Sequence, residues 1–359
     1  MNKQLAFLLL GPVFLASCTQ DAEEMLTSQV EINDNTPVAI RLGWGNTTLE
    51  TKAGLEGTIP QTDSLGVFML AIDKQPQNML APSPSWLESN GAWMDNQRAK
   101  IDAGGTISFY NHDFTADSTC YYPLDSYYKY NFFAYQPFSE EIIKGDNDCT
   151  VVFKDLYGTK DIIWGRSAVP TDEYANYAYS ARYYLINREN PLIPVIHFEH
   201  KLMRLKFSLG GLNPTGNPGY NDYEKLTLLK LWIKNVPTEA QLDIVSGHFE
   251  ADWGDTSILN NIYLCDADDQ PFTPVTIQST TPQSIGQPIM LPIPNGEEKF
   301  KLGMQFSCEG NDNTIYEVNV TLDKTGFVAG HGYNVKILVP GLDYIIPEPT
   351  VIDIVEEQE

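Results

Sequence analysis

Apolar and polar residues alternate along much of this chain. Residues 38–44, 300–306 and 316–322 each place apolar side chains at every second position, with polar or small side chains between them. This spacing predicts β-strands that have one buried and one exposed face. Residues 127–135 and 226–233 are apolar on both faces and predict central strands, and no window shows a helical stripe longer than two turns. The expected fold is all-β, with packed antiparallel sheets.

One stretch rich in glycine and proline interrupts this pattern. Residues 210–219 read GGLNPTGNPG and cannot continue a strand, while extended segments resume on both sides. We therefore expect a domain boundary here, between an N-terminal β-sandwich at residues 37–210 and a C-terminal β-sandwich at residues 220–359.

The first residues have the features of an export signal. Residues 1–17 contain one lysine near the start and a largely apolar run that is too short to span a bilayer. The sequence Leu15-Ala16-Ser17-Cys18 has the pattern of a bacterial lipobox and predicts lipid attachment at Cys18. Residues 18–36 would then form an acidic tether. An ordinary signal peptide followed by an incidental cysteine is the alternative.

Charge narrows the range of partners. The 359 residues include 23 Lys and Arg against 47 Asp and Glu, which gives a formal net charge of −24. A surface this anionic repels phosphate groups, so nucleic-acid binding is not expected.

Residues with catalytic or metal-binding chemistry are scattered along the chain. No nucleophile-elbow, zinc-protease, Walker or dinucleotide-binding motif occurs, so we expect neither enzyme activity nor a cofactor. His197 and His200 are three residues apart on an expected strand, which points them to opposite faces and argues against a shared metal. Four cysteines besides Cys18 could form disulfides in an exported chain or remain buried thiols, and the sequence leaves this open. They are Cys120, Cys149, Cys265 and Cys308.

Five further motifs follow the lipobox. They are Thr51-Lys52-Ala53, the aromatic stretch at 121–137, Asp161-Ile162-Ile163-Trp164-Gly165, Phe198-Glu199-His200-Lys201-Leu202 and Gly332-Tyr333-Asn334-Val335-Lys336-Ile337. Together with the lipobox, their order and spacing resemble those of the fimbrillin family, the lipoprotein-derived pilins of type V pili. The resemblance implies two transthyretin-like antiparallel β-sandwich domains in tandem, export to the outer membrane and cell surface, and strand exchange between subunits.

The resemblance also implies which segments would take part in assembly. A protease would cut after Lys52, where the family usually carries arginine, or after Arg41. The cut would release the first strand, with its apolar side chains Val38, Ile40, Leu42 and Trp44. A neighbouring subunit would fill the groove with its tail, residues 349–355, through Val351, Ile352, Ile354 and Val355. Alternatively, Lys52 is a loop lysine, the tail is an ordinary C-terminal strand, and an uncut chain stays in the membrane.

The expected function is that of a structural and adhesive subunit of a cell-surface pilus. Its partners would be other pilin subunits in a homo- or hetero-polymer, the outer membrane through the lipid, and host or bacterial surface ligands. The alternative is a monomeric surface lipoprotein that binds glycans, for which Trp86, Trp93 and Trp253 are the candidate sugar platforms. An exported glycosidase is the third interpretation.

Overall fold

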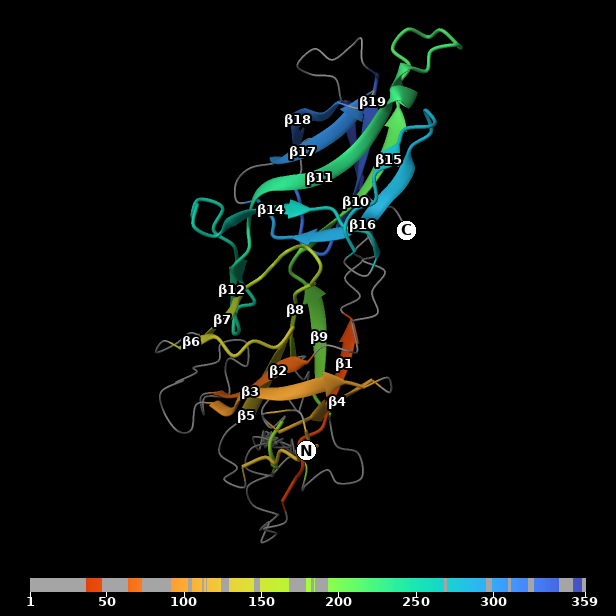
Figure 1. The fold of residues 1–359 in the computed structure, drawn as a ribbon. Helices are drawn as coiled ribbons and strands as arrows, with labels where there is room; N and C mark the ends of the chain where they lie inside the picture. Colours follow the sequence, from red (N-terminus) through yellow and green to blue (C-terminus); the bar gives the residue numbers. More distant parts are fainter. Residues whose placement is uncertain are drawn as a thin grey trace, which may run out of the picture.

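The strands form two groups, one from each half of the chain, and a smaller sheet joins them (Figure 1). The structure is a computed structural model. It describes residues 37–46, 64–72, 92–102, 105–111, 113, 115–123, 129–144, 149–167, 179–181, 184, 193–267, 270–294, 299–308, 311–321, 326–341 and 351–356. Nearly all regular structure in these residues is β-strand, so the all-β prediction is confirmed.

Seven strands of the N-terminal half form a closed barrel. In hydrogen-bonded order they are β1 (Leu42–Asn46), β4 (Thr106–Phe109), β3 (Ala92–Ile101), β2 (Leu65–Ile72), β5 (Lys129–Gln136), β8 (Ile163–Ser167) and β9 (Val195–His200). Neighbouring strands are antiparallel except β1 and β9, which run parallel. The N-terminal strands therefore make one continuous sheet that closes on itself, where the sequence predicted two packed sheets.

The strand β5 lies between β2 and β8, as its apolar sequence predicted. Phe132 points into the barrel interior, whereas Phe133 and Tyr135 belong to a second core on the outer side of the same strands. Because both faces are covered, β5 is apolar at consecutive positions and lacks the usual alternation.

A four-stranded and a five-stranded sheet form a sandwich in the C-terminal half. One has the order β16 (Gln283–Leu291), β10 (Met203–Gly211), β19 (Gly332–Val339) and β20 (Val351–Glu356). The other has the order β14 (Leu259–Tyr263), β11 (Leu226–Pro237), β17 (Lys299–Cys308) and β18 (Asn311–Thr321), and β15 (Val275–Thr276) also pairs with β11. Side chains from both sheets share one core that includes Phe207, Leu302 and Val335.

A third sheet combines strands from the two halves of the sequence. Its order is β13 (Phe249–Glu250), β12 (Ala240–Asp243), β7 (Cys149–Phe153) and β6 (Ile142–Lys144). This sheet covers the outer faces of β2, β5 and β8 and builds the second core, which includes Phe68, Val151 and Leu242. The indole N–H of Trp164 in β8 donates to the carbonyl of Ile244 at 2.9 Å and reinforces the joint.

The stretch rich in glycine and proline lies inside the C-terminal group, in the loop that leads from β10 through a short 3₁₀ turn (Asp222–Lys225) to β11. The amide oxygen of Asn213 accepts hydrogen bonds from the backbone N–H of Thr215 (3.1 Å) and Gly216 (3.0 Å) and so holds this loop. The structure differs here from the expected boundary, because β10 was assigned to the N-terminal domain yet pairs with β16 and β19. A loop within one sandwich uses the same residue types as a linker between domains.

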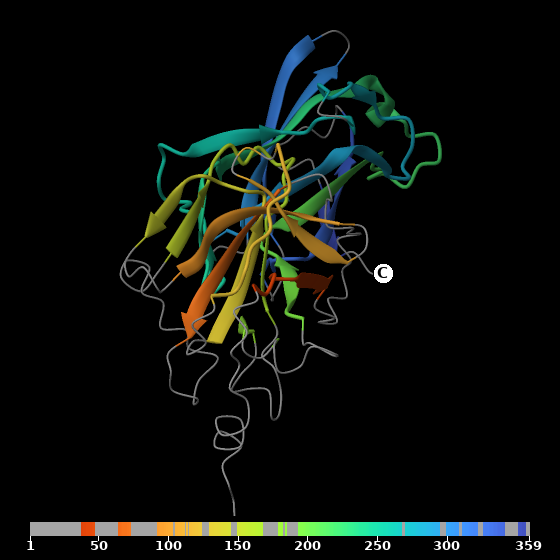
Figure 2. The same cartoon turned by 90° about the horizontal axis from the view of Figure 1, so that it is seen from below.

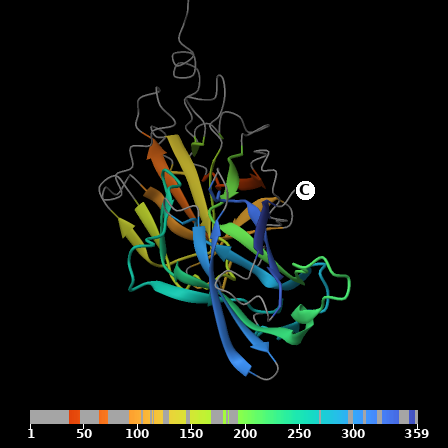
Figure 3. The same ribbon diagram turned by 90° about the horizontal axis from the view of Figure 1, so that it is seen from above.

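Figures 2 and 3 view the molecule along the long axis of Figure 1, from below and from above, so that the sandwich and the barrel overlap. The hairpin of β17 and β18 extends beyond the other strands in both views. The outer edge of β18 has no neighbouring strand among the described residues, and Ile315 on it is largely exposed.

The contact between β8 and β9 gives a stability prediction. A Cβ atom on Gly165 would lie 2.4 Å from the carbonyl oxygen of His197, so we expect Gly165→Ala to lower the free energy of unfolding by about 1–3 kcal/mol. Gly219→Ala is the matched control, because the nearest atom to its Cβ would be 3.7 Å away, and it should change stability by less than about 0.5 kcal/mol. Urea unfolding measures both, and equal effects would contradict the close approach.

Candidate functional site

The strand β1 closes the barrel between β4 and β9 (Figure 1). Its start pairs antiparallel with β4, where Leu42 lies opposite Ile107. From Gly43 to Asn46 it runs parallel to β9. Removing β1 would therefore open the barrel and expose one edge of β4 and one edge of β9.

Alternate side chains of this segment face the barrel core, as the sequence pattern predicted. Ile40 and Leu42 are 5% and 1% exposed, and Val38 and Trp44 are partly buried against the same core. Arg41, between the two buried residues, is exposed. Residues 38–44 therefore have one apolar face toward the barrel core and one polar face toward solvent. A peptide that replaced them would need the same two faces.

The residues just before β1 are also held by the backbone. The N–H of Ile40 donates to the carbonyl of Cys120 at 2.8 Å, and the N–H of Tyr122 donates to the carbonyl of Val38 at 2.9 Å. On the other side, the N–H of Gly43 donates to the carbonyl of Pro194 at 2.8 Å. Backbone hydrogen bonds therefore hold residues 38–43 on both sides, and any extended peptide can form the same bonds.

The structure places only part of the predicted maturation sites. Arg41 is solvent-accessible but adjoins the backbone-bonded residues Ile40 and Leu42. Cys18 and Lys52 lie outside the described residues, so lipid attachment and cleavage remain predictions.

The C-terminal tail pairs within its own chain. β20 runs antiparallel to β19 from Val351, opposite Leu338, to Glu356, opposite Tyr333. It is an edge strand of the described sheet, since β19 has β10 on its other side. The predicted donor residues Val351, Ile352, Ile354 and Val355 therefore occupy the position of an ordinary C-terminal strand, which was the alternative interpretation of the tail.

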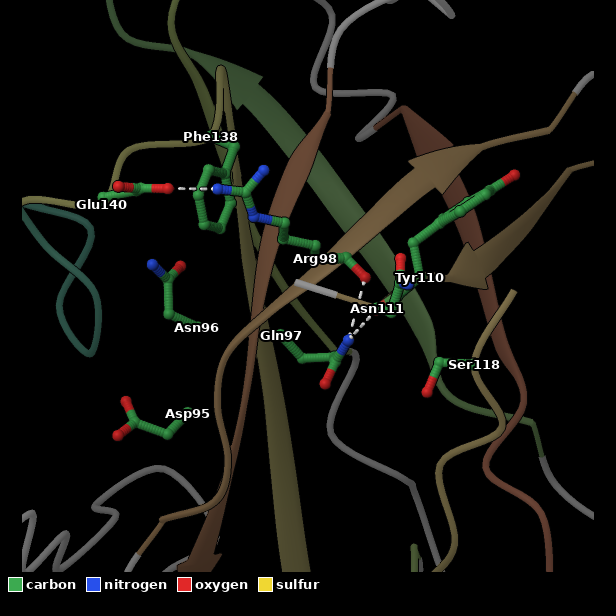
Figure 4. A pocket seen from close by; sticks show the side chains of 9 residues that line it. All are labelled: Asp95, Asn96, Gln97, Arg98, Tyr110, Asn111, Ser118, Phe138 and Glu140. Carbon is green, nitrogen blue, oxygen red and sulfur yellow. Dashed lines mark hydrogen bonds and ion pairs between the residues drawn. The ribbon is translucent and has the colours of Figure 1, made fainter. Parts of the chain in front are cut away.

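A polar hollow of about 490 Å³ lies on the outer side of the barrel (Figure 4). Its lining comes from β3, the end of β4 and the segment after β5. The lining residues are Asp95, Asn96, Gln97, Arg98, Tyr110, Asn111, Ser118, Phe138 and Glu140.

Hydrogen bonds fix the amide of Asn96 at one side of the hollow. Its oxygen accepts a hydrogen bond from the hydroxyl of Tyr135 at 2.7 Å, and its nitrogen donates to the carbonyl of Ser139 at 2.8 Å. Asn96 has a positive φ of 53°, a conformation that asparagine tolerates better than most residues. Burial raises the pKa of Tyr135 well above its usual value, so its hydroxyl stays protonated and donates to Asn96.

Arg98 occupies the centre of the hollow. Its guanidinium carbon lies 4.1 Å from the ring centroid of Phe138, and its terminal nitrogen forms an ion pair with Glu140 (Figure 4). The neighbouring Asp95 forms an ion pair with Lys144 from β6. The planar cation is thus held between a ring face and a carboxylate.

The described residues hold no group of three or more His, Cys, Asp or Glu that could bind a metal ion. His200 pairs through its Nδ1 with the carboxylate of Asp161. No helix among the described residues is long and apolar enough to cross a membrane.

Of the three tryptophans considered as sugar platforms, the structure describes the side chain of Trp253. The indole N–H of Trp253 donates to the carbonyl of Ile293 at 3.0 Å, and its ring packs on the sandwich core. Trp253 is therefore a packing residue, contrary to the exposure we expected from its loop-like sequence. Trp86 and the side chain of Trp93 lie outside the description.

Sequence patterns did not reveal the hollow. Its residues come from segments of different periodicity, and several of them are polar positions on a strand that normally face solvent. The asparagine within an otherwise extended segment, at position 96, was the one local signal of irregular backbone.

A closed barrel joined to a sandwich defines an all-β protein. Sequence comparison identifies the group. The profile of the family described as fimbrillin-like matches residues 51–353, and the chain belongs to this family. None of the curated proteins matches its sequence.

The chain is also similar in fold to solved structures. A candidate cell adhesion protein from Bacteroides uniformis is 16% identical, with a TM-score of 0.50, and the match covers 90% of this chain and 98% of that one. A fimbrial protein from Bacteroides vulgatus is 13% identical, with a TM-score of 0.48 and coverage of 90% and 99%. The fimbrial anchor protein Mfa2 from Porphyromonas gingivalis is 9% identical, with a TM-score of 0.39 and coverage of 90% and 98%.

No disulfide joins the four described cysteines to one another, and Cys120 lies beside the segment that leads into β1. Its carbonyl accepts the bond from Ile40, and its side chain packs against the barrel core. Burial raises the pKa of the Cys120 thiol to about 11, so the reactive thiolate is scarce at pH 8 and increases as the pH rises toward that value.

We therefore expect slow alkylation of Cys120 at pH 8 and a faster reaction in Leu42→Ala, which weakens the packing of β1. Leu302→Ala creates a comparable cavity in the sandwich core and should leave the alkylation rate of Cys120 unchanged. Mass spectrometry of the alkylated peptides measures both rates. An equal increase in the two variants would show that Cys120 does not respond to β1 in particular.

Proposed function

We propose that this protein is a structural and adhesive subunit of a cell-surface pilus, and not an enzyme. It is exported as a lipoprotein anchored through Cys18, cut by a protease, and assembled by strand exchange. Membership in the fimbrillin-like family supports the pilus role. The observation that carries the assembly mechanism is the position of β1, the single strand that closes the barrel.

Loss of β1 would leave a defined acceptor. The edges of β4 and β9 would be unpaired, and the core would lose Ile40 and Leu42. These two side chains alone contribute about 3–6 kcal/mol, at about 1.5–3 kcal/mol for each fully buried side chain. A strand from another subunit recovers a comparable amount if it runs parallel to β9 and antiparallel to β4, as β1 does.

The two candidate cleavage sites have different consequences for β1. A cut after Arg41 leaves Leu42–Asn46 joined to the rest of the chain and keeps the barrel closed. A cut after Lys52 separates the whole of β1 from β2. We therefore assign productive maturation to Lys52.

The donor is the tail of a neighbouring subunit. β20 is bonded on one side only among the described strands, so it can leave β19 without breaking the pairing of β19 with β10. Transfer from β19 to the acceptor of the next subunit joins subunits head to tail and gives a filament.

Location and partners follow from this assembly. Polymers of this or related pilin subunits would extend from the outer membrane, where an uncut chain remains held by its lipid. The acidic chain, with a net charge of −24, has no features that attract nucleic acid.

A monomeric lipoprotein that binds surface glycans is the second candidate function. The polar hollow is the observation that favours it, because amide, carboxylate, hydroxyl and aromatic groups meet there. The two functions differ in whether the first strand is removed.

Cells that export the full-length chain to their surface provide the test. N-terminal mass analysis should find a start at Ala53, and denaturing gels should show detergent-resistant ladders. Lys52→Ala should abolish both because β1 then stays in place, whereas the control Arg41→Ala should change neither. Deletion of residues 351–359 should keep the start at Ala53 and abolish the ladders.

An intact chain that begins at Cys18 and remains monomeric would contradict the proposal and favour the second function. Ladders that persist after deletion of the tail would reject the donor role of residues 351–355 and leave the cleavage step standing.

A further inference from the structure

The polar hollow is separate from the segments that take part in assembly. None of its lining residues belongs to β1, β4, β9 or β20, although Tyr110 and Asn111 directly follow β4. Met94, Ala99 and Ile101 of β3 are buried in the barrel interior. The hollow lies on the opposite side of this strand. A ligand in the hollow therefore need not disturb the acceptor or the donor.

Internal contacts hold the lining side chains in place. The side-chain nitrogen of Gln97 donates to the backbone carbonyls of Arg98 and Tyr110, and these bonds leave its amide oxygen available as an acceptor (Figure 4). Asn96 is fixed by Tyr135 and by the backbone of Ser139. Side chains ordered in advance lose little conformational entropy when a ligand binds.

The charge of the hollow limits the kind of ligand. The two lining carboxylates, Asp95 and Glu140, form ion pairs with Lys144 and Arg98, so their charges are compensated locally. This balance, on a chain with a net charge of −24, disfavours an anionic ligand. The described residues contain no cluster suited to a metal ion either.

The hydroxyl groups of a ligand would match the polar atoms that line the hollow. Carboxylate oxygens and the amide oxygen of Gln97 accept hydrogen bonds, and the hydroxyl of Ser118 can both donate and accept. The rings of Tyr110 and Phe138 add apolar surface beside these groups, with Lys100 over one face of Tyr110 and Arg98 over one face of Phe138. The volume of about 490 Å³ falls within the range of about 300–1,000 Å³ that is usual for small-molecule sites.

We propose that this hollow binds a neutral carbohydrate, a short segment of an uncharged surface glycan. The amide of Gln97 and the carboxylates accept sugar hydroxyls, and the ring of Tyr110 contacts the apolar face of a pyranose. This site would give the protein an adhesive activity that does not depend on polymerisation.

An array of neutral and sialylated oligosaccharides, probed with the purified full-length chain, tests the site. Neutral glycans should be retained in preference to sialylated ones, and calorimetric titration with the best neutral oligosaccharide should give its dissociation constant. Gln97→Ala and Tyr110→Ala should each weaken binding by about tenfold or more. Ser118→Phe, which fills the hollow from its side, should abolish binding.

Matched controls lie elsewhere on the surface. Gln241→Ala and Tyr157→Ala remove an exposed glutamine and an exposed tyrosine outside the hollow, and both should bind like the parent chain. Thermal melting confirms that each variant is folded. If Tyr110→Ala does not fold, the single variants Gln97→Ala and Ser118→Phe are sufficient for the test.

The proposal is overturned if no neutral glycan is retained, if sialylated glycans are preferred, or if hollow and control variants bind equally. These outcomes are distinguishable from a failure of pilus assembly, because ladders on denaturing gels are measured on the same chains and depend on β1 and the tail.

Discussion

The hydrogen bonds that β1 makes to β4 on one side and to β9 on the other are the constraint on which the N-terminal half depends. A barrel has no free edge only while every strand has two neighbours, and β1 is the neighbour that β4 and β9 share. The same strand supplies Ile40 and Leu42 to the interior through the residues at and before its start. Edge protection and core packing are thus concentrated in one short segment at the beginning of the described chain.

Two further cores lie outside the barrel interior to which this segment contributes. The strands β2, β5 and β8 are covered by β7 and β12, and the second core lies on the far side of the barrel wall from β1. The sandwich has its own core, built from β10, β11, β16, β17 and β19. The proposed donor β20 sits at an edge of that sandwich, whereas β1 has a neighbour on each side in the barrel.

Alternation along the sequence was sufficient to predict the strands and the inward side chains of the first strand. It predicted β17 and β18 from residues 300–306 and 316–322, and β5 and β11 from runs that are apolar on both faces. These predictions succeed because periodicity reports which faces are buried.

Pairing partners were beyond the reach of periodicity. Nothing local in the sequence of β12 indicates that it pairs with β7, about 90 residues earlier, or that β10 belongs with β16 and β19. The hollow was missed for the same reason, since Arg98, Tyr110 and Phe138 meet only after the barrel forms. Trp253 appeared exposed from its neighbours in sequence, yet it packs against the sandwich core.

Under the proposed assembly, a fimbrillin-like chain whose own first strand fills the acceptor would be exported without premature assembly. Proteolysis would then convert a stable barrel into one with a single open groove, and the apolar floor of that groove supplies the driving force for the next subunit. In this proposal, cleavage releases β1 and strand exchange replaces it.

Hydrogen exchange on a chain of residues 53–350, compared with a chain of residues 37–350, tests the replaceable strand most directly. We predict that the shorter chain loses amide protection in β4 and β9 but not in β11 and β17, and that a synthetic peptide of residues 37–46 restores it. Loss of protection throughout the molecule, or unchanged protection in β4 and β9, would contradict the central role of β1.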